Sequence, residues 1–212
     1  MRALLLALFC CVGAISAKAA TLTFEEVGEL PSGGVHYFTE VDKFTFDSTC
    51  PIVCDPGYPV GARLLNGSEN LNGSPWNKLY NTATNVFYFE DSYETTMSLT
   101  DGGSFDVEGA YFGNLYPGGK NYLKGYAGST LLYEMEFDVP QVVNNAEPSL
   151  EYFVINMQGI DRLHLSSDTP STSYNVMDSM SYTVNAVPLP AAAWLFGSAL
   201  LGLGIIKRRK AA

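Results

Sequence analysis

Residues 131–139, with the sequence LLYEMEFDV, decide the fold class of this 212-residue chain. Apolar side chains from Leu131 to Val139 alternate with the carboxylates of Glu134, Glu136 and Asp138. Alternation with a period of two residues is typical of a β-strand that has one face against a core and the other in water. We therefore expect a strand here, with its carboxylates on the solvent side.

The same pattern recurs on both sides of this segment. Phe105 and Val107 alternate with Asp106 and Glu108, and Tyr111 continues their apolar face. Clusters of Gly, Asn, Pro and Ser separate the runs, and no helical periodicity occurs between the two ends of the chain. About ten strands of this kind predict an all-β fold, a single β-sandwich with jelly-roll topology. Shorter aromatic or β-branched runs lie at 21–24, 41–46, 86–89, 95–99, 122–126, 150–155, 161–165 and 180–184.

The first 19 residues have the three regions of a secretory signal peptide. Arg2 supplies the positive charge, residues 3–15 the apolar run, and residues 17–19 a small-x-small cleavage site. We expect cleavage after residue 19, so that the exported domain spans residues 20–186. Cys10 and Cys11 suggest a lipoprotein as an alternative, but Phe9 stands where a lipobox needs a small residue.

The C-terminal segment 187–210 joins three parts in a fixed order. Its parts are a Pro-x-Pro element (Val187, Pro188, Leu189, Pro190), an apolar run at 191–206, and a basic end (Lys207, Arg208, Arg209, Lys210). The 20 uncharged residues from 187 to 206 would span about 30 Å as a helix, close to one hydrocarbon core. Four cations beside a transmembrane helix stay in the cytoplasm, so the domain before it would face outward. The alternative is a buried core helix with a basic end. Such a helix would not need apolar residues on every face, whereas this run has them on every face.

These three parts resemble the PEP-CTERM sorting signal of Gram-negative bacteria, in which a Pro-Glu-Pro element precedes a transmembrane stretch and an Arg-rich end. Pro188 and Pro190 match the two prolines, and Leu189 stands where the commonest form has Glu. The resemblance implies processing by signal peptidase and an exosortase, a transient anchor in the inner membrane, and a final place at the cell surface or outside the cell. The departure at Leu189 leaves the exosortase subtype open.

A second resemblance covers residues 85–185. The segments DGGSFDV (101–107), LKGYAGSTLLY (123–133), GIDRLHLSS (159–167) and VMDSMSYTV (176–184) look like the pattern of many PEP-CTERM cargo domains. Those domains resemble galactose-binding-like jelly rolls, the architecture of many carbohydrate-binding modules.

The charge of the exported part limits its partners. Six of the 12 basic residues lie in the two ends, whereas all 22 acidic residues lie between Glu25 and Asp178, so the formal charge of the domain is −16. Such a surface repels nucleic acid and anionic membranes. It suits divalent cations, neutral glycans or cationic partners.

Cys50 and Cys54, in the sequence CPIVC, are the two cysteines left in the exported domain. An oxidising compartment favours a local disulfide between them. The alternatives are a redox pair, which usually has a shorter spacing, and half of a metal site.

The sequence offers little for catalysis. It contains two histidines, His36 and His164, and none of the common nucleophile or metalloprotease motifs. His164 shares its strand face with Arg162, opposite Leu163 and Leu165, which indicates a solvent-facing residue. Paired carboxylates leave a secreted hydrolase as an alternative, but a wet strand face explains the acidic residues more simply. We expect no enzyme.

Calcium is the inorganic ligand that the acidic residues suit best, because hard cations prefer clustered oxygen ligands. Glu25 and Glu26 follow the first predicted strand, and Asp178 precedes the last, where jelly rolls of the resembled kind often hold a structural calcium. In a regular strand Asp178 would also lie on the same face as apolar neighbours. A buried carboxylate is costly unless it is paired. The alternative is a bulge at residues 177–179 that turns Asp178 outward.

Glycan binding needs aromatic faces beside hydrogen-bonding side chains. The long irregular stretch 47–83 offers Tyr58, Trp76 and Tyr80 among several Asn residues, and long loops often carry function. The alternative is that these rings cap the core.

The sequence thus favours a non-enzymatic protein of the cell envelope or extracellular matrix, sorted by an exosortase and associated with exopolysaccharide or biofilm. A carbohydrate-binding module that recognises a polysaccharide is the alternative.

Overall fold

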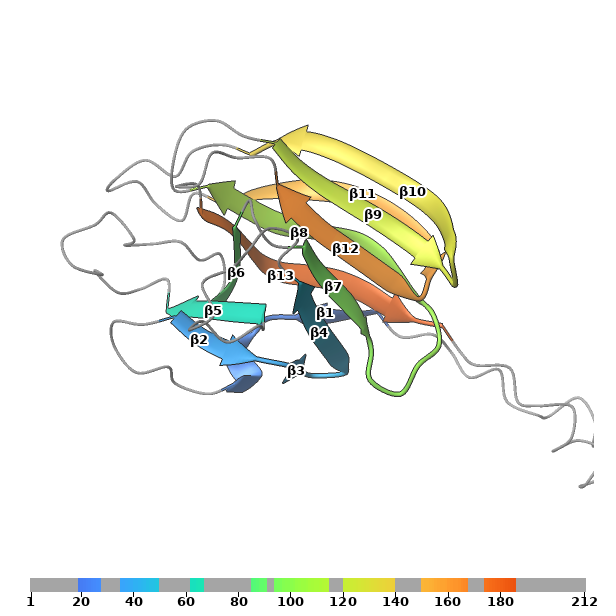
Figure 1. Ribbon diagram of the computed structural model, residues 1–212, viewed down its shortest axis with the longest axis horizontal. Coiled ribbons are helices and arrows are strands. Elements are labelled where there is room, and N and C mark those ends of the chain that lie inside the picture. The colour runs from blue at the N-terminus through green and yellow to red at the C-terminus, as the bar shows by residue number, and fades with distance from the viewer. Residues whose placement is uncertain are drawn as a thin grey trace, which may run out of the picture.

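The computed structural model describes residues 19–27, 35–49, 62–66, 85–90, 94–114, 120–139, 150–167 and 174–185. These residues form strands β1 to β13 and a 3-10 turn, η1 (Glu25–Val27), and the strands pair antiparallel in two sheets. Figure 1 shows the two sheets packed as layers. The predictions of an all-β fold and a β-sandwich are confirmed.

Sheet A has the order β11-β8-β13-β6-β5-β2, and β1 pairs with the second half of β13. Its strands are β1 (Ala19–Leu22), β2 (Val35–Phe38), β5 (Ala62–Asn66), β6 (Asn85–Glu90), β8 (Phe105–Asn114), β11 (Glu151–Ile160) and β13 (Tyr174–Val184). Neighbours in this sheet are mostly distant in sequence, so its pairing is non-local.

Sheet B has the order β10-β9-β12-β7-β4-β3. Its strands are β3 (Glu40–Val41), β4 (Phe44–Thr49), β7 (Glu94–Leu99), β9 (Lys120–Ala127), β10 (Thr130–Asp138) and β12 (Arg162–Ser167). Two short turns, at 42–43 and 128–129, connect β3 to β4 and β9 to β10 as hairpins.

Aromatic rings fill the space between the sheets. The ring of Phe87 in sheet A lies 5.6 Å from that of Phe46 in sheet B and 5.8 Å from that of Phe24, which follows β1. Toward the other end of the core, Phe44 of sheet B lies 5.1 Å from Phe105 and 4.8 Å from Tyr182 of sheet A, ring centre to ring centre. These buried contacts join the two layers into one core.

Residues 131–138 of the segment 131–139 belong to strand β10, as predicted, but the alternation begins only at Tyr133. From there Glu134, Glu136 and Asp138 are exposed, while Phe137 is buried. Leu131, expected on the apolar face, is 44% exposed. The pairing of β10 with β9 shifts register between Leu131 and Tyr133, and such an irregularity changes which face a side chain takes.

Tyr111 departs from its predicted face for a similar reason. Val107, Ala110 and Phe112 belong to the core, so the side-chain parity of β8 changes between Val107 and Ala110. Tyr111 therefore lies on the outer face of sheet A, with its ring 5.0 Å from that of Tyr152.

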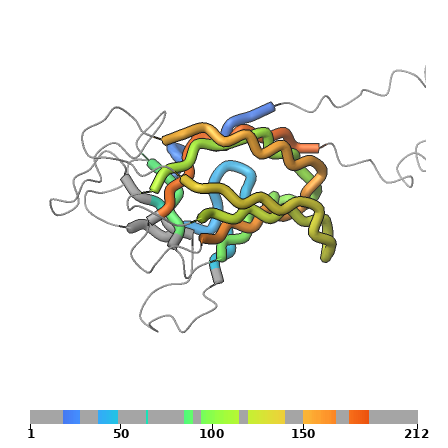
Figure 2. Tube along the Cα trace, turned by 90° about the horizontal axis from the view of Figure 1, so that it is seen from above, coloured from blue at the N-terminus to red at the C-terminus, as the bar shows by residue number. Residues whose placement is uncertain are grey.

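The two ends of the described domain lie side by side. Ala19 pairs with Thr183, and the backbone N–H of Asn185 donates to the carbonyl of Ser104 (2.9 Å). Figure 2 shows both ends leaving the sandwich on the same side. Among the described residues, no helix has the length and hydropathy that a membrane crossing requires. The predicted signal peptide, Pro-x-Pro element, membrane segment and basic end lie outside the described residues, apart from Ala19.

Gly109 marks the change of parity in β8. A Cβ at this position would lie 2.5 Å from the carbonyl oxygen of Phe153 and would also overlap the Tyr152 side chain. Real Cβ atoms do not approach a backbone oxygen so closely, so only glycine lets β8 and β11 pair here.

We predict that Gly109→Ala lowers the free energy of unfolding by about 1–3 kcal/mol, the usual cost of overpacking. Gly102→Ala is the control, because a Cβ there meets nothing within 4 Å and carries only the cost of a positive φ of 74°. Urea denaturation of both variants measures the difference. A Gly109→Ala protein as stable as the wild type would show that β8 and β11 pair differently.

Candidate functional site

The middle of sheet B carries an outward stripe of aromatic and basic side chains. Odd positions of β9 and β12 face inward, where Leu123, Leu163 and Leu165 are buried. Even positions face outward and are half-buried or exposed. The outward residues, which we call the β9–β12 stripe, are Lys120, Tyr122, Lys124 and Tyr126 of β9 and Arg162, His164 and Ser166 of β12.

The register of the two strands brings these residues together. Arg162 pairs with Tyr126, His164 with Lys124, and Ser166 with Tyr122. Directly opposite residues have Cβ atoms about 5 Å apart, within side-chain contact. The stripe is therefore a continuous surface across β9 and β12.

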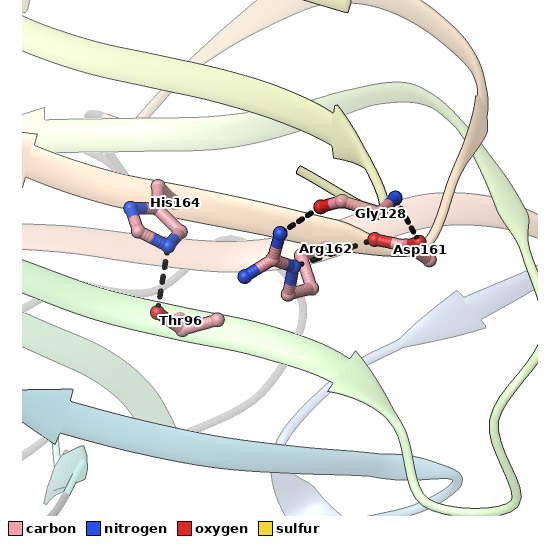
Figure 3. Close-up of polar contacts among 5 residues, drawn as sticks. All are labelled: Thr96, Gly128, Asp161, Arg162 and His164. Atoms are coloured by element: carbon pink, nitrogen blue, oxygen red, sulfur yellow. Dashed lines mark hydrogen bonds and ion pairs between the residues drawn. The ribbon is translucent and has the colours of Figure 1, made fainter. Parts of the chain in front are cut away.

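Tyr126, Arg162 and His164 form the centre of the stripe. The Tyr126 ring lies 5.0 Å from the His164 ring, at an interplanar angle of 55°. The guanidinium carbon of Arg162 lies 5.4 Å from the centre of the Tyr126 ring, within the range of a cation–π contact. On the other side, His164 Nε2 and Thr96 Oγ1 of β7 form a 2.9 Å hydrogen bond (Figure 3).

Asp161 fixes the turn beside this centre. Its Oδ2 accepts from the Gly128 N–H at 2.5 Å, and its own N–H donates to the Tyr126 carbonyl at 2.8 Å. Arg162 Nη2 donates to the Gly128 carbonyl, and Arg162 Nε donates weakly to Asp161 Oδ1 (3.4 Å) (Figure 3). Because these bonds hold both the turn and the guanidinium, Arg162 stays over the Tyr126 ring.

His164 is a neutral group at neutral pH. Its burial lowers the pKa of the imidazole below the ordinary 6.5; Glu94 opposes this effect, and the nearby cations Arg162 and Lys124 add to it. Asp47 also belongs to this neighbourhood, since it pairs with Thr96 across β4 and β7. A neutral imidazole has one nitrogen that donates and one that accepts, so it can bond both Thr96 and a ligand hydroxyl.

Both lysines of the stripe are paired with carboxylates of β10. Lys124 Nζ lies 3.1 Å from Glu134 Oε1, and Lys120 forms an ion pair with Glu136. The hydrogen bond to the partner carboxylate, followed by its charge, raises the pKa of each lysine. The lysines are thus fully protonated and already neutralised at neutral pH.

The predicted outward direction of the His164 side chain is confirmed, but the contacts around it were not predicted. The side chain is outward, opposite Leu163 and Leu165, yet it is half-buried and hydrogen-bonded. Tyr122 and Tyr126 were predicted only as part of a strand. The alternation of Lys and Tyr at 120, 122, 124 and 126 is the signal that could have identified this face. The other candidates, Tyr58, Trp76, Tyr80, Cys50 and Cys54, lie outside the described residues.

Asp178 and Glu25, two of the acidic residues considered for calcium, lie in different settings. The predicted bulge occurs next to Asp178: the pairing of β13 with β8 shifts register after it, and Ser179 has a φ of 50°. Asp178 is nevertheless fully buried, and Ser179 Oγ donates to its Oδ1 (3.0 Å). Glu25 Oε1 accepts from the N–H of Asn85 at 2.5 Å. Within the described ranges no group of three or more His, Cys, Asp or Glu could hold a metal ion, so calcium at Glu25, Glu26 and Asp178 stays a prediction.

We predict that His164 makes the stability of the domain fall as the pH decreases. The unfolded chain, with an imidazole pKa near 6.5, takes up the proton more readily than the folded one. The stability from the neutral imidazole is therefore complete above 6.5 and is lost as the pH falls through the lower folded value. Urea denaturation at about pH 7.5 and about pH 5 measures this loss.

His164→Gln is the control for this measurement, because it keeps a group that can bond Thr96 but does not titrate. The stability of this variant should depend less on pH than that of the wild type. An equal dependence of stability on pH in both proteins would mean that folding does not change the pKa of the imidazole.

No family model matches the sequence, and no curated protein matches it. Among solved structures, the chain is similar to TmCBM61 in complex with beta-1,4-galactotriose, with a TM-score of 0.41 and 11% identity, over 69% of this chain and 92% of that one. It is also similar to the CBM22-1–GH10 modules of the N-terminal endo-1,4-beta-D-xylanase 10B of Clostridium thermocellum complexed with xylohexaose. That similarity has a TM-score of 0.36 and 14% identity, over 80% of this chain and 28% of that one. At these values neither similarity bears on the ligand of this chain.

Proposed function

We propose that this chain is an exported, non-enzymatic domain of jelly-roll topology that binds a polysaccharide, and that the β9–β12 stripe is its binding face. One observation carries the proposal: Tyr126 and His164 present adjacent rings on an open sheet, surrounded by side chains that can donate or accept hydrogen bonds. Sugars have apolar C–H faces and polar hydroxyls, so they suit a surface that mixes rings with a few polar groups.

The dimensions of the stripe suit a chain rather than a single sugar. Tyr122 and Tyr126 are four residues apart on β9, which corresponds to about 13 Å along a strand. Hydroxyl groups flank the rings, with Ser166 of β12 beside Tyr122 and Ser98 of β7 beside Arg162. An extended polysaccharide that lies along β9 would meet both tyrosines.

The stripe is also held in one geometry before any ligand arrives. The bonds of Asp161 and Arg162 to the turn at Gly128 hold the guanidinium of Arg162 beside the Tyr126 ring. Groups that are already ordered lose little entropy on binding. The sequence contributes a separate candidate, the aromatic residues Tyr58, Trp76 and Tyr80, which lie outside the described residues.

We predict that Tyr126→Ala weakens polysaccharide binding about ten-fold, the equivalent of about 1.4 kcal/mol. The variant loses the ring and leaves the rest of the stripe in place. Tyr126→Phe, which keeps the ring, should bind nearly as well as the wild type. Binding is measured on a glycan array and then by calorimetry on the best polysaccharide.

Tyr152→Ala is the matched control for this experiment, because Tyr152 is 41% exposed on the outer face of the other sheet. Binding that responds to Tyr152 and not to Tyr126 would place the site elsewhere. The same samples are assayed for release of reducing sugar. Turnover that disappears on changing one carboxylate would favour the hydrolase alternative over a binding domain.

The delivery of the domain forms a second part of the proposal. We propose that the segment 187–210 anchors the chain in the inner membrane until an exosortase removes it, so that the domain reaches the cell surface or the extracellular matrix. The pairing of Ala20 with Tyr182 supports this route, because the signal peptide and the tail would then leave the folded domain at one end.

We predict that the mature protein from a strain with a working exosortase lacks the tail that begins at residue 187. Mass spectrometry of its C-terminal peptide measures this directly. In a strain without the exosortase the same peptide should extend to Ala212. An intact C-terminus in both strains would contradict sorting by this signal.

A further inference from the structure

We infer that the polysaccharide bound by the β9–β12 stripe is uncharged, and that the carboxylates around the stripe exclude polyanions such as polyuronates and sulfated glycans. The inference rests on the proposed function and concerns its specificity. It comes from the arrangement of charge on the outer face of sheet B.

The stripe concentrates positive charge, since it holds three of the six basic residues of the domain (Lys120, Lys124, Arg162). Taken alone, this would suggest an anionic ligand. Each of the three cations, however, already has a carboxylate partner on the protein: Glu136, Glu134 and Asp161 respectively. An anionic ligand would have to displace these partners or bind beside them.

Further carboxylates border the stripe on both sides. On the β10 side, Asp138 is exposed and contributes to the raised pKa of Lys120. On the β7 and β4 side, Glu94 and Asp47 are exposed on the same outer face. Glu94 acts on both Lys124 and His164, raising their pKa values by its charge. It therefore lies close to the centre of the stripe.

The outer face of sheet B as a whole is acidic. Its strands expose six carboxylates and three cations; the carboxylates are Glu40, Asp47, Glu94, Glu134, Glu136 and Asp138. The strand β10 lies one strand spacing, about 5 Å, from β9, which is shorter than the Debye length of about 8 Å at physiological salt. The strand β7 lies two spacings, about 10 Å, from β9. A polyanion lying on β9 would therefore be repelled mainly by the carboxylates of β10, and less strongly by Glu94 of β7.

The other polar and aromatic groups of this face are uncharged. They are the rings of Tyr122 and Tyr126, the imidazole of His164, and the hydroxyls of Thr96, Ser98 and Ser166. Such groups bond hydroxyls of a sugar without requiring a charge. The paired cations serve to orient the stripe, as Arg162 does for Tyr126.

The test compares neutral and anionic polysaccharides on matched backbones, such as hydroxyethylcellulose against carboxymethylcellulose and fully methyl-esterified polygalacturonate against polygalacturonate, within a broad glycan array. We expect binding to neutral members only, with an affinity that changes less than about two-fold between low and physiological salt. Binding to a polyanion that weakens with salt would overturn the inference and leave polysaccharide binding intact. No binding to any glycan would overturn the proposed function and the inference with it.

A charge variant tests the mechanism of exclusion. Glu134→Gln combined with Glu136→Gln releases Lys124 and Lys120 from their partners, and it should allow polygalacturonate to bind on the order of ten times more tightly at low salt than the control does. Glu108→Gln combined with Glu151→Gln is the control, because it makes the same change of net charge at exposed positions of sheet A. Equal behaviour of the two double variants would show that net charge alone, and not the pairing on sheet B, sets the preference.

Discussion

The pairing of β9 with β12 is the constraint on which both the core and the candidate site depend. Leu123, Leu163 and Leu165 are fully buried because the core must cover them. Because successive side chains of a strand point to opposite faces, the side chains at the even positions of both strands lie on the outer face. A shift of one residue would expose the leucines and bury two lysines and an arginine, at a prohibitive cost. The same hydrophobic pattern that closes the sandwich therefore aligns Tyr122, Tyr126 and His164 on its surface.

The partners of the stripe come from regions far apart in sequence. Thr96, the partner of His164, is 68 residues away. Asp161 lies 33 residues from Gly128, whose turn it holds. Each contact is local in the sheet and remote in the chain. Ordering of the site thus occurs together with the assembly of sheet B, and the rigidity of the stripe follows from the stability of the whole sandwich rather than from one loop.

The distribution of charge on this surface differs from what the net charge of the domain suggests. The domain is strongly acidic, yet half of its basic residues gather on two adjacent strands. Ion pairs between exposed groups stabilise a fold only slightly, because water and salt screen them, so the pairs Lys124–Glu134 and Lys120–Glu136 contribute little to stability. Their larger consequence concerns recognition, because a lysine that is already paired offers little to an anion while its alkyl stem still covers apolar surface.

The sequence by itself determined the class of the fold and the inward and outward faces of its regular strands. Alternation is a local property, so Phe137 and Glu134 could be assigned to opposite faces without knowing what they contact. It failed at Leu131 and Tyr111, where irregular pairing changes the parity. At Asp178 the predicted bulge occurs, and the carboxylate is buried beside it. Only the tertiary structure decided which strands are neighbours, and hence that Tyr126, Arg162, His164 and Thr96 share one surface. Strand order depends on contacts between residues many tens of positions apart, and no local pattern in the chain records them.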